Sequence, residues 1–420
     1  MKSIRRVAVI VLVNLALIAL VLEAAGNVLH WRERGRLFYG RPRTVAVQVP
    51  AINPFALAEY RPVIHPYFGY VYVARPGVDL RYNFQANNHS FIQRRDYVLA
   101  HPGCCDFPVV QRDPDEAIIG IFGGSVAGNV AHAAQAEDRL ARLLAGAPRF
   151  AGKRIRVLSF AVGGHKQPQQ LAILAYYLSL GQKLDAIVDV DGFNEVVFGH
   201  EDLDHGIALT FPTPWLSLAR FLSDQRIKPD AGLLLAAYHD IEARTWNERA
   251  DRCRRFATCY LFAWTMAKWH ALGAPNWSST ADVPVNPDYF AVNKPAPGDP
   301  FEQIADNWAE SLALMAAMAQ AHGTPFVAMI QPNQWFRATT PFKPRTQDGF
   351  NQYAMRMVPP GYRALIARIP RLRERGVTVL DPTKIFDALG DDIYEDDCCH
   401  FVAAGNAMLV EEIAKWLAAQ

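Results

Sequence analysis

A serine, a histidine and an aspartate in this chain have the types and surroundings that acyl transfer requires. Ser125 follows two glycines and an apolar run over residues 117–121, so it lies at a predicted turn from a strand to a helix. At such a turn the hydroxyl is exposed and backbone N–H groups converge near it. A serine reacts only when a base removes its proton, and His400 could act as that base. Asp397, three residues earlier, could hold the imidazole in the required tautomer.

Two further residues could stabilise the negative oxygen of a tetrahedral intermediate. The N–H of Gly164 and the side-chain amide of Asn194 would join the N–H of Ser125 in an oxyanion hole. Simpler interpretations exist, because Gly163 and Gly164 could form a tight turn and Asn194 could cap a helix. His400 could equally be a surface histidine. The order of these residues along the chain favours the catalytic interpretation, and this chemistry requires no metal and no cofactor.

The order of these blocks resembles the SGNH (GDSL-type) hydrolase superfamily over roughly residues 115–420. The matching blocks are Gly123-Gly124-Ser125, Gly163-Gly164, Asn194 and Asp397-x-x-His400. The resemblance implies the nucleophile, oxyanion-hole and triad roles given above. The chain departs from the family at Gly124 and at Glu195, because the family more usually has aspartate at both positions.

Five short apolar segments, separated by helical patterns, indicate the fold. They cover residues 117–122, 155–160, 186–190, 325–330 and 377–380. Each has the length of a buried strand, and strand–helix alternation is typical of a parallel sheet with helices on both faces. We therefore expect a three-layer α/β/α fold with a five-stranded, mostly parallel, flavodoxin-like sheet. Sites in such sheets lie at the carboxyl ends of the strands, where these blocks fall.

Composition limits the class of protein. Hydrophobic residues make up 51% of the 420 residues and charged residues 20%, as in a globular protein with a sizeable core. The 43 lysines and arginines nearly balance 41 acidic residues, and the net charge is +2. The sequence therefore lacks the strong positive field that nucleic-acid binding needs.

The N-terminus has the pattern of a membrane segment. Basic residues up to Arg6 precede the apolar run 7–22, which is close to the length that crosses a bilayer. The alternative is a cleavable signal peptide, because residues 24–26 are small. We expect an uncleaved single-pass anchor in a bacterial inner membrane, with the main domain exported to the periplasm. The predicted parts are this segment (1–27), an irregular extension (28–114) and a catalytic domain (115–420) with an insertion (198–300).

The six cysteines suit an exported protein, because disulfides form in oxidising compartments. They occur as Cys104-Cys105, Cys253 with Cys259, and Cys398-Cys399. Cys253 and Cys259 could close a small loop, and one of the 104/105 pair could join one of the 398/399 pair. The alternative is that the thiols are free and buried. The sequence contains no C-x-x-C pair, which disfavours a zinc site of the common spacing.

Two other regions could contribute to a site. The insertion contains five of the nine tryptophans, so it could be a lid or a platform for sugars, or simply the core of a helical subdomain. Asn333 and Gln334 follow the fourth predicted strand and could contact substrate, or could form a capping turn.

These features favour a serine-dependent ester hydrolase that acts through an acyl-enzyme on an acylated glycan or other envelope ester. One alternative is an acyltransferase, in which a polysaccharide hydroxyl replaces water. The other is a non-catalytic envelope-assembly or glycan-binding protein with the same fold.

Overall fold

The computed structural model divides the chain into two compact units. One unit comprises Met1–Pro50 and Asp224–Pro284, and the other comprises Ala51–Ser223 and Val285–Gln420. The predicted extension and insertion are thus each shared between the units. The structure describes residues 2–34, 37–40, 61–73, 83–110, 113–212, 246, 249–250, 253, 256–273, 297–338, 341–345 and 349–420.

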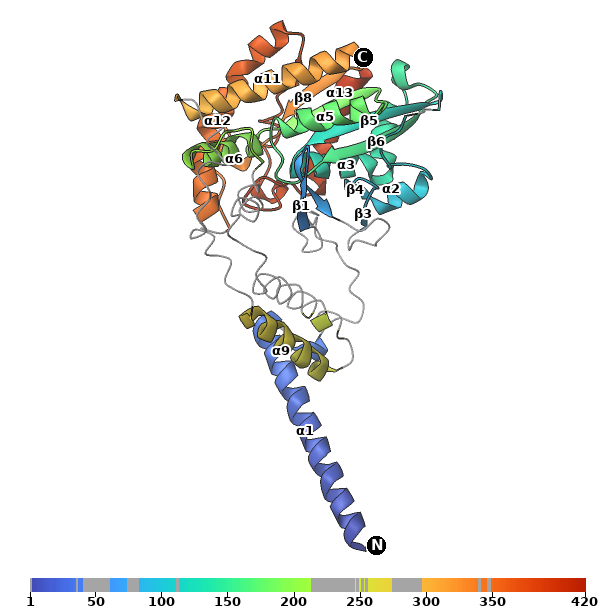
Figure 1. Cartoon of the computed structure of the whole chain (residues 1–420), viewed down its shortest axis with the longest axis vertical. Helices are drawn as coiled ribbons and strands as arrows, with labels where there is room; N and C mark the ends of the chain where they lie inside the picture. The colour runs from blue at the N-terminus through green and yellow to red at the C-terminus, as the bar shows by residue number, and fades with distance from the viewer. Residues whose placement is uncertain are drawn as a thin grey trace. The chain divides into compact units, whose positions relative to one another are not determined.

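A five-stranded parallel sheet forms the centre of the larger unit (Figure 1). Its strands are β5 (Glu116–Gly123), β6 (Arg154–Ala161), β7 (Ala186–Asp191), β8 (Phe326–Ile330) and β9 (Thr378–Leu380). The strand order is β6-β5-β7-β8-β9, and every pairing is parallel. All five predicted strands are therefore present, each within one residue or so of its expected position. The predicted α/β/α class is confirmed.

Helices cover both faces of this sheet, as the continuous apolar strands require. They are α3 (Ser125–Gln135), α4 (Arg139–Leu144), α5 (Gln169–Ser179), α6 (Phe193–Asp204), α11 (Pro300–Ala321), α12 (Gly349–Glu374) and α13 (Ala403–Ala418). Helix α13 packs on α3 and α4, whereas α11 packs on α5, α6 and α12. Figure 1 shows α5 and α11 in front of the sheet. Every residue of β5 and β7 is buried between these two layers.

Two short hairpins precede the sheet. Strand β1 (Arg61–His65) pairs with β2 (Gly69–Val73), and β3 (Phe84–Ala86) pairs with β4 (Ile92–Arg94), which leads into α2 (Arg95–Ala100). Phe68, Tyr70 and Phe91 are buried in the same core as the sheet. The described part of this segment therefore packs against the sheet through aromatic side chains of the two hairpins and of the turns that join their strands.

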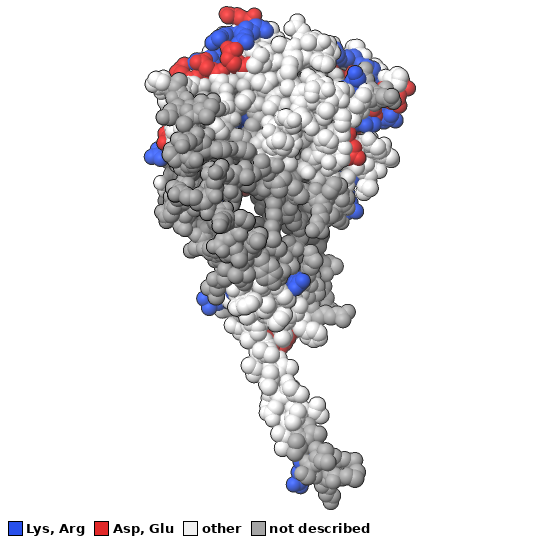
Figure 2. Space-filling view, in the orientation of Figure 1, with Lys and Arg blue, Asp and Glu red and all other residues white. Residues whose placement is uncertain are grey.

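In the smaller unit, two helices pack together. Helix α1 (Lys2–Arg34) contains a 24-residue stretch, Val9–Arg32, that is long and apolar enough to cross a membrane. A short 3-10 helix, η1 (Phe38–Gly40), follows, and α9 (Ala257–Gly273) contacts the C-terminal part of α1. Figure 2 shows α1 as a straight helix that carries no charged side chains along most of its length. Of the two possibilities for Cys253 and Cys259, free thiols or a small closed loop, the structure has the loop, closed by a disulfide. Cys253 precedes α9, and Cys259 lies in its first turn.

Candidate active site

Ser125 and His400 are hydrogen-bonded to each other although 275 residues separate them in the chain. Ser125 is the first residue of α3, directly after the carboxyl end of β5, and His400 lies shortly before α13. The distance from Ser125 Oγ to His400 Nε2 is 2.7 Å. Both residues are buried, with 8% and 6% of their surfaces exposed. The structure therefore brings together the predicted nucleophile and its predicted base.

The carboxylate beside this histidine belongs to Asp396, and the assignment of Asp397 from the sequence is corrected. Asp396 Oδ2 lies 2.5 Å from His400 Nδ1. The other oxygen, Oδ1, accepts the backbone N–H groups of Cys398, Cys399 and His400 at 2.9, 2.9 and 3.1 Å. These bonds wrap the chain around the Asp396 carboxylate and point its second oxygen at the imidazole. Asp397 is also buried. The turn nevertheless brings Asp396, four residues before His400, next to Nδ1.

The environment of Asp396 keeps it ionised. Burial opposes the charge, but the hydrogen bond and charge of His400, with the N–H groups of Cys399 and His400, hold the pKa of the Asp396 carboxyl well below its ordinary value. An acceptor at Nδ1 places the remaining lone pair of a neutral imidazole on Nε2, facing the serine. The Asp396–His400–Ser125 chain therefore has the polarity of a proton-abstracting triad.

Asn194 lies against the turn that carries Ser125. It is the second residue of α6, after the carboxyl end of β7, and its Nδ2 donates to the carbonyl of His165 at 2.7 Å. A Cβ built on Gly124 would lie 2.2 Å from this Nδ2. Gly124, a departure from the resembled family, is therefore explained: in this chain any side chain there would collide with the Asn194 amide. Because an amide nitrogen carries two hydrogens, the second can face an oxyanion.

The glycine turn after β6 is held by Tyr70 from the second hairpin strand. Tyr70 Oη donates to the carbonyl of Gly163 at 2.7 Å. A Cβ on Gly164 would lie 2.7 Å from the same Tyr70 Oη. Gly164 has φ +81°, a conformation that favours glycine. His165 is fully buried, which lowers its pKa to about 3, and its Nε2 lies 3.1 Å from the carbonyl oxygen of Tyr70. A neutral His165 therefore donates to Tyr70, and the hairpin positions the predicted oxyanion-hole loop.

Buried carboxyl groups lie beneath the turns after β6 and β7. Glu195 accepts the N–H of Gly192 at 2.6 Å and that of Gln167 at 3.2 Å, so it ties the two turns together. The side-chain amide of Gln167, Nε2, donates to the carboxyl groups of Asp189 and Asp191 at 2.9 and 3.0 Å. Burial raises the pKa of Glu195 to about 8 and that of Asp189 to about 7. These residues support the site. Glu195 stood out in the sequence as a departure from the family pattern, whereas Gln167, Asp189 and Asp191 carried no signal beyond their position near strand ends.

Asn333 and Gln334 hold the histidine loop. Asn333 Oδ1 accepts the N–H of Trp335 at 2.9 Å and caps the 3-10 helix η7 (Gln334–Phe336), so the capping-turn alternative is present here. Asn333 is fully buried, and its Nδ2 donates to the carbonyl of Cys398 at 3.2 Å. Gln334 Nε2 donates to the carbonyl of Asp396 at 3.3 Å. The Arg345 guanidinium donates to the two preceding carbonyls, of Tyr394 and Glu395, each at 2.6 Å. These three side chains therefore position the backbone that carries Asp396 and His400.

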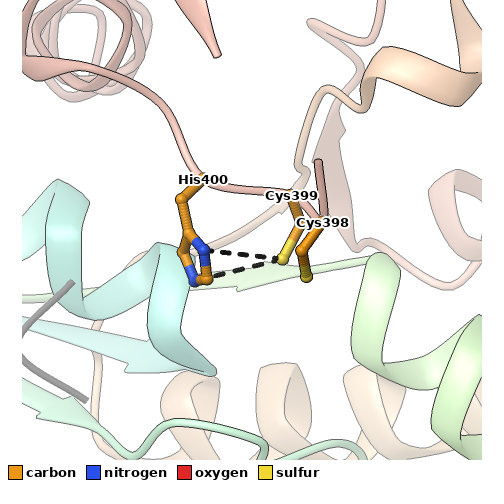
Figure 3. Close-up of side chains that lie close together, drawn as sticks. All are labelled: Cys398, Cys399 and His400. Carbon is orange, nitrogen blue, oxygen red and sulfur yellow. Dashed lines mark hydrogen bonds between the residues drawn. The ribbon is translucent and has the colours of Figure 1, made fainter. Parts of the chain in front are cut away.

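Cys398 and Cys399 lie within this loop, and neither is in a disulfide. Cys104 and Cys105 are bonded to each other, so the hypothesis of a bond between the two cysteine pairs is wrong. Figure 3 shows the sulfur of Cys399 facing the imidazole of His400. Its Sγ lies 3.9 Å from Nε2 and 4.0 Å from Nδ1. Burial raises the pKa of both thiols, which keeps them uncharged beside the histidine.

Comparisons with known proteins add little to this geometry. No protein-family model and no curated protein matches the chain. Among solved structures the chain is similar to an acetyl xylan esterase, with 12% identity over 72% of this chain and 100% of that one. The TM-score is 0.32, so the similarity carries no argument about activity.

Proposed function

We propose that this protein is a serine-dependent acyl ester hydrolase of the SGNH type. The observation that carries the proposal is the hydrogen-bonded chain from Asp396 through His400 to Ser125, with distances of 2.5 and 2.7 Å. It lies at the carboxyl ends of parallel strands, where α/β sheets bind their ligands. A serine, an imidazole and a carboxylate in this order are the requirements of nucleophilic acyl transfer.

The reaction proceeds in two steps. His400 Nε2 takes the proton of Ser125 as Oγ attacks the ester carbonyl, and the alcohol then leaves with that proton. This forms an acyl-enzyme on Ser125. Water then attacks the acyl group, gives its proton to His400 and releases the acid as the proton returns to Ser125. Asp396 remains ionised throughout and stabilises the imidazolium.

The oxyanion of each tetrahedral intermediate is stabilised by fixed donors. The N–H groups of Ser125 and Gly164 and the Asn194 amide are the proposed set, and loss of one such donor typically costs about 3 kcal/mol of transition-state stabilisation. The close approach of Gly124 to Asn194 supports this assignment, because it brings the amide against the nucleophile turn.

Acylated glycans and other envelope esters are the proposed substrates.

Hydrolysis of an aryl acetate tests the proposal. We expect turnover by the wild type, loss of turnover in Ser125→Ala, and wild-type turnover in Ser179→Ala, which removes an exposed serine on α5. An inactive wild type that is folded would favour the non-catalytic alternative. Product analysis with an added glycan acceptor separates hydrolysis from the acyltransferase alternative, in which acyl groups appear on the glycan.

The helix pair of the smaller unit supports a retained membrane anchor. The Glu23 carboxylate of α1 accepts the N–H groups of Ala257 and Thr258 at 2.6 and 2.9 Å, and so caps the start of α9. A Cβ on Gly26 would lie 2.2 Å from the carbonyl oxygen of Ala257, so the helices touch at the small residues. Cleavage of a signal peptide at residues 24–26 would remove these contacts. We therefore favour an uncleaved anchor, with both disulfides, Cys104–Cys105 and Cys253–Cys259, on the exported side of the membrane.

Helix α9 extends the proposed membrane contact. Its buried stripe of Ala257, Tyr260 and Ala263 belongs to the core shared with η1. On its other side Phe262 and Trp269 are 58% and 59% exposed. A helix that is apolar on all sides is usually buried or in contact with lipid. Helix α9 thus fits a bilayer contact better than a lid, while Trp215 and Trp277 of the insertion lie outside the described residues.

A further inference from the structure

We propose that Cys398, Cys399 and His400 form a binding site for a soft divalent cation such as Zn²⁺, and that binding there switches the serine off. The binding stands on the geometry of these three side chains. The inhibition rests in addition on the proposed catalysis by Ser125.

The donor set suits zinc. One ligand atom from each of the three residues lies within 4.8 Å of the others. A tetrahedral zinc with bonds of about 2.3 Å to sulfur and 2.05 Å to nitrogen separates these two ligand atoms by about 3.6 Å. Cys399 Sγ lies 3.9 Å from His400 Nε2 and 4.0 Å from Nδ1, so the sulfur lies to one side of the Nε2 lone pair. Binding of one ion by both atoms therefore requires the Cys399 side chain to rotate toward Nε2. Two thiolates and an imidazole leave one coordination position open for water.

The surroundings of His400 also match a metal-binding histidine. Such histidines usually donate their second N–H to a carboxylate, which fixes the tautomer and makes the bound nitrogen more basic. Asp396 occupies this place at His400 Nδ1, at 2.5 Å. The bonds from Asn333 to the Cys398 carbonyl, and from the loop N–H groups to Asp396, hold the cysteine backbone in place. The Asp396–His400 pair can therefore serve either a serine or a metal ion.

Charge balance permits a cation in this buried loop. Binding releases one proton from each thiol, and two thiolates neutralise the two charges of the ion. No electron transfer is involved. The buried complex then carries no net charge apart from Asp396, which is already compensated by its hydrogen bonds.

Metal binding and catalysis compete for the same lone pair. In the structure His400 Nε2 is bonded to Ser125 Oγ at 2.7 Å. When the lone pair of Nε2 binds the metal ion, it can no longer accept the serine proton. Ser125 is then left without a base, and acylation stops.

The test uses the full-length protein in detergent after treatment with a chelator. Zinc binding is measured by competition with a chromogenic chelator, and labelling of Ser125 by a fluorophosphonate is measured with and without zinc. We expect one zinc per chain, and labelling that zinc blocks and chelation restores. The Cys398→Ser/Cys399→Ser variant should bind zinc at least about 100-fold more weakly and label equally with and without zinc.

Two controls separate the outcomes. Ser125→Ala should bind zinc at least as well as the wild type, because the competing hydroxyl is gone. In the wild type, zinc should protect Cys398 and Cys399 from alkylation, which peptide mapping detects even if the double variant does not fold. Equal binding by wild type and double variant, or no protection of these thiols, overturns the proposal. A wild type that binds zinc here but never labels contradicts only the proposed catalysis.

Discussion

Gly124 and Asn194 are in such close contact that the glycine has no room for a side chain. A Cβ at position 124 would lie 2.2 Å from Asn194 Nδ2, well inside van der Waals contact. This glycine was the clearest departure from the resembled family. Its contact links the serine turn to the proposed oxyanion donor.

Gly124→Ala should therefore displace the Asn194 amide. We expect kcat to fall by about 10²–10³-fold, as for loss of one oxyanion donor, and KM to change little. Asn194→Ala should give a similar loss, and the double variant should be little worse than either. Gly146→Ala is the matched control, because a Cβ there meets no atom within 4 Å. Full activity of Gly124→Ala would contradict the role of Asn194.

Tyr70→Phe should loosen the glycine loop without emptying the core. The change removes only the hydroxyl that donates to Gly163 at 2.7 Å, and a hydrogen bond of this kind is worth about 1 kcal/mol. We expect kcat to fall by about ten-fold, with a small loss of thermal stability. Tyr67→Phe, at an exposed tyrosine of the same hairpin, should behave as wild type. Identical kinetics for the two variants would show that the hairpin does not position the loop.

Glu195 should make the protein less stable as the pH rises. Its folded pKa of about 8 lies above the ordinary value of 4.5, so the folded state holds a proton that the unfolded state has lost. The free energy of unfolding should fall between pH 5 and 8, with a contribution from Glu195 of about 1–3 kcal/mol. Urea unfolding at several pH values should show a shallower decline in Glu195→Gln, and an unchanged one in the surface variant Glu374→Gln. Equal slopes in all three proteins would contradict a buried, protonated Glu195.

Trp269 on α9 should contact lipid. In vesicles that contain brominated phosphatidylcholine, its fluorescence should be quenched, so Trp269→Phe should lose a large part of the quenchable signal. Trp308→Phe removes a fully buried tryptophan of the larger unit and should leave the quenchable part intact. If the two variants are quenched alike, α9 does not lie against the bilayer.

The sheet could be predicted because its strands are buried on both faces and read as continuous apolar runs. Ser125 and His400 were found because their roles depend on order along the chain and on strand ends. Asp396 was missed because spacing alone does not distinguish the third from the fourth residue before the histidine. The N–H groups that bond to its Oδ1 decide the matter, and they belong to the folded turn.

Other contacts left no signal in the sequence. Tyr70 lies 93 residues before the glycine it bonds to, in a segment that reads as irregular. A capping turn at Asn333 could be predicted from the sequence and is present. The bonds from the side chains of Asn333 and Gln334 to the histidine loop could not be predicted, because they depend on the fold of that loop. The tryptophans of the insertion were compatible with a lid, a sugar platform or the core of a helical subdomain. Trp246 and Trp264 pack against the core of the smaller unit. The packing of α9 against α1 could not be predicted, because it depends on Glu23 and Gly26, more than 200 residues away.

The most direct test of the triad compares Asp396→Asn with Asp397→Asn. The rate at which a fluorophosphonate labels Ser125, followed by intact mass and peptide mapping, reports the activation of the serine without any assumption about substrate. We predict that Asp396→Asn slows labelling by about 10⁴-fold, because the imidazole loses its tautomer and orientation, whereas Asp397→Asn labels within about ten-fold of wild type. The reverse order, or labelling on a residue other than Ser125, would contradict the proposed Asp396–His400–Ser125 triad.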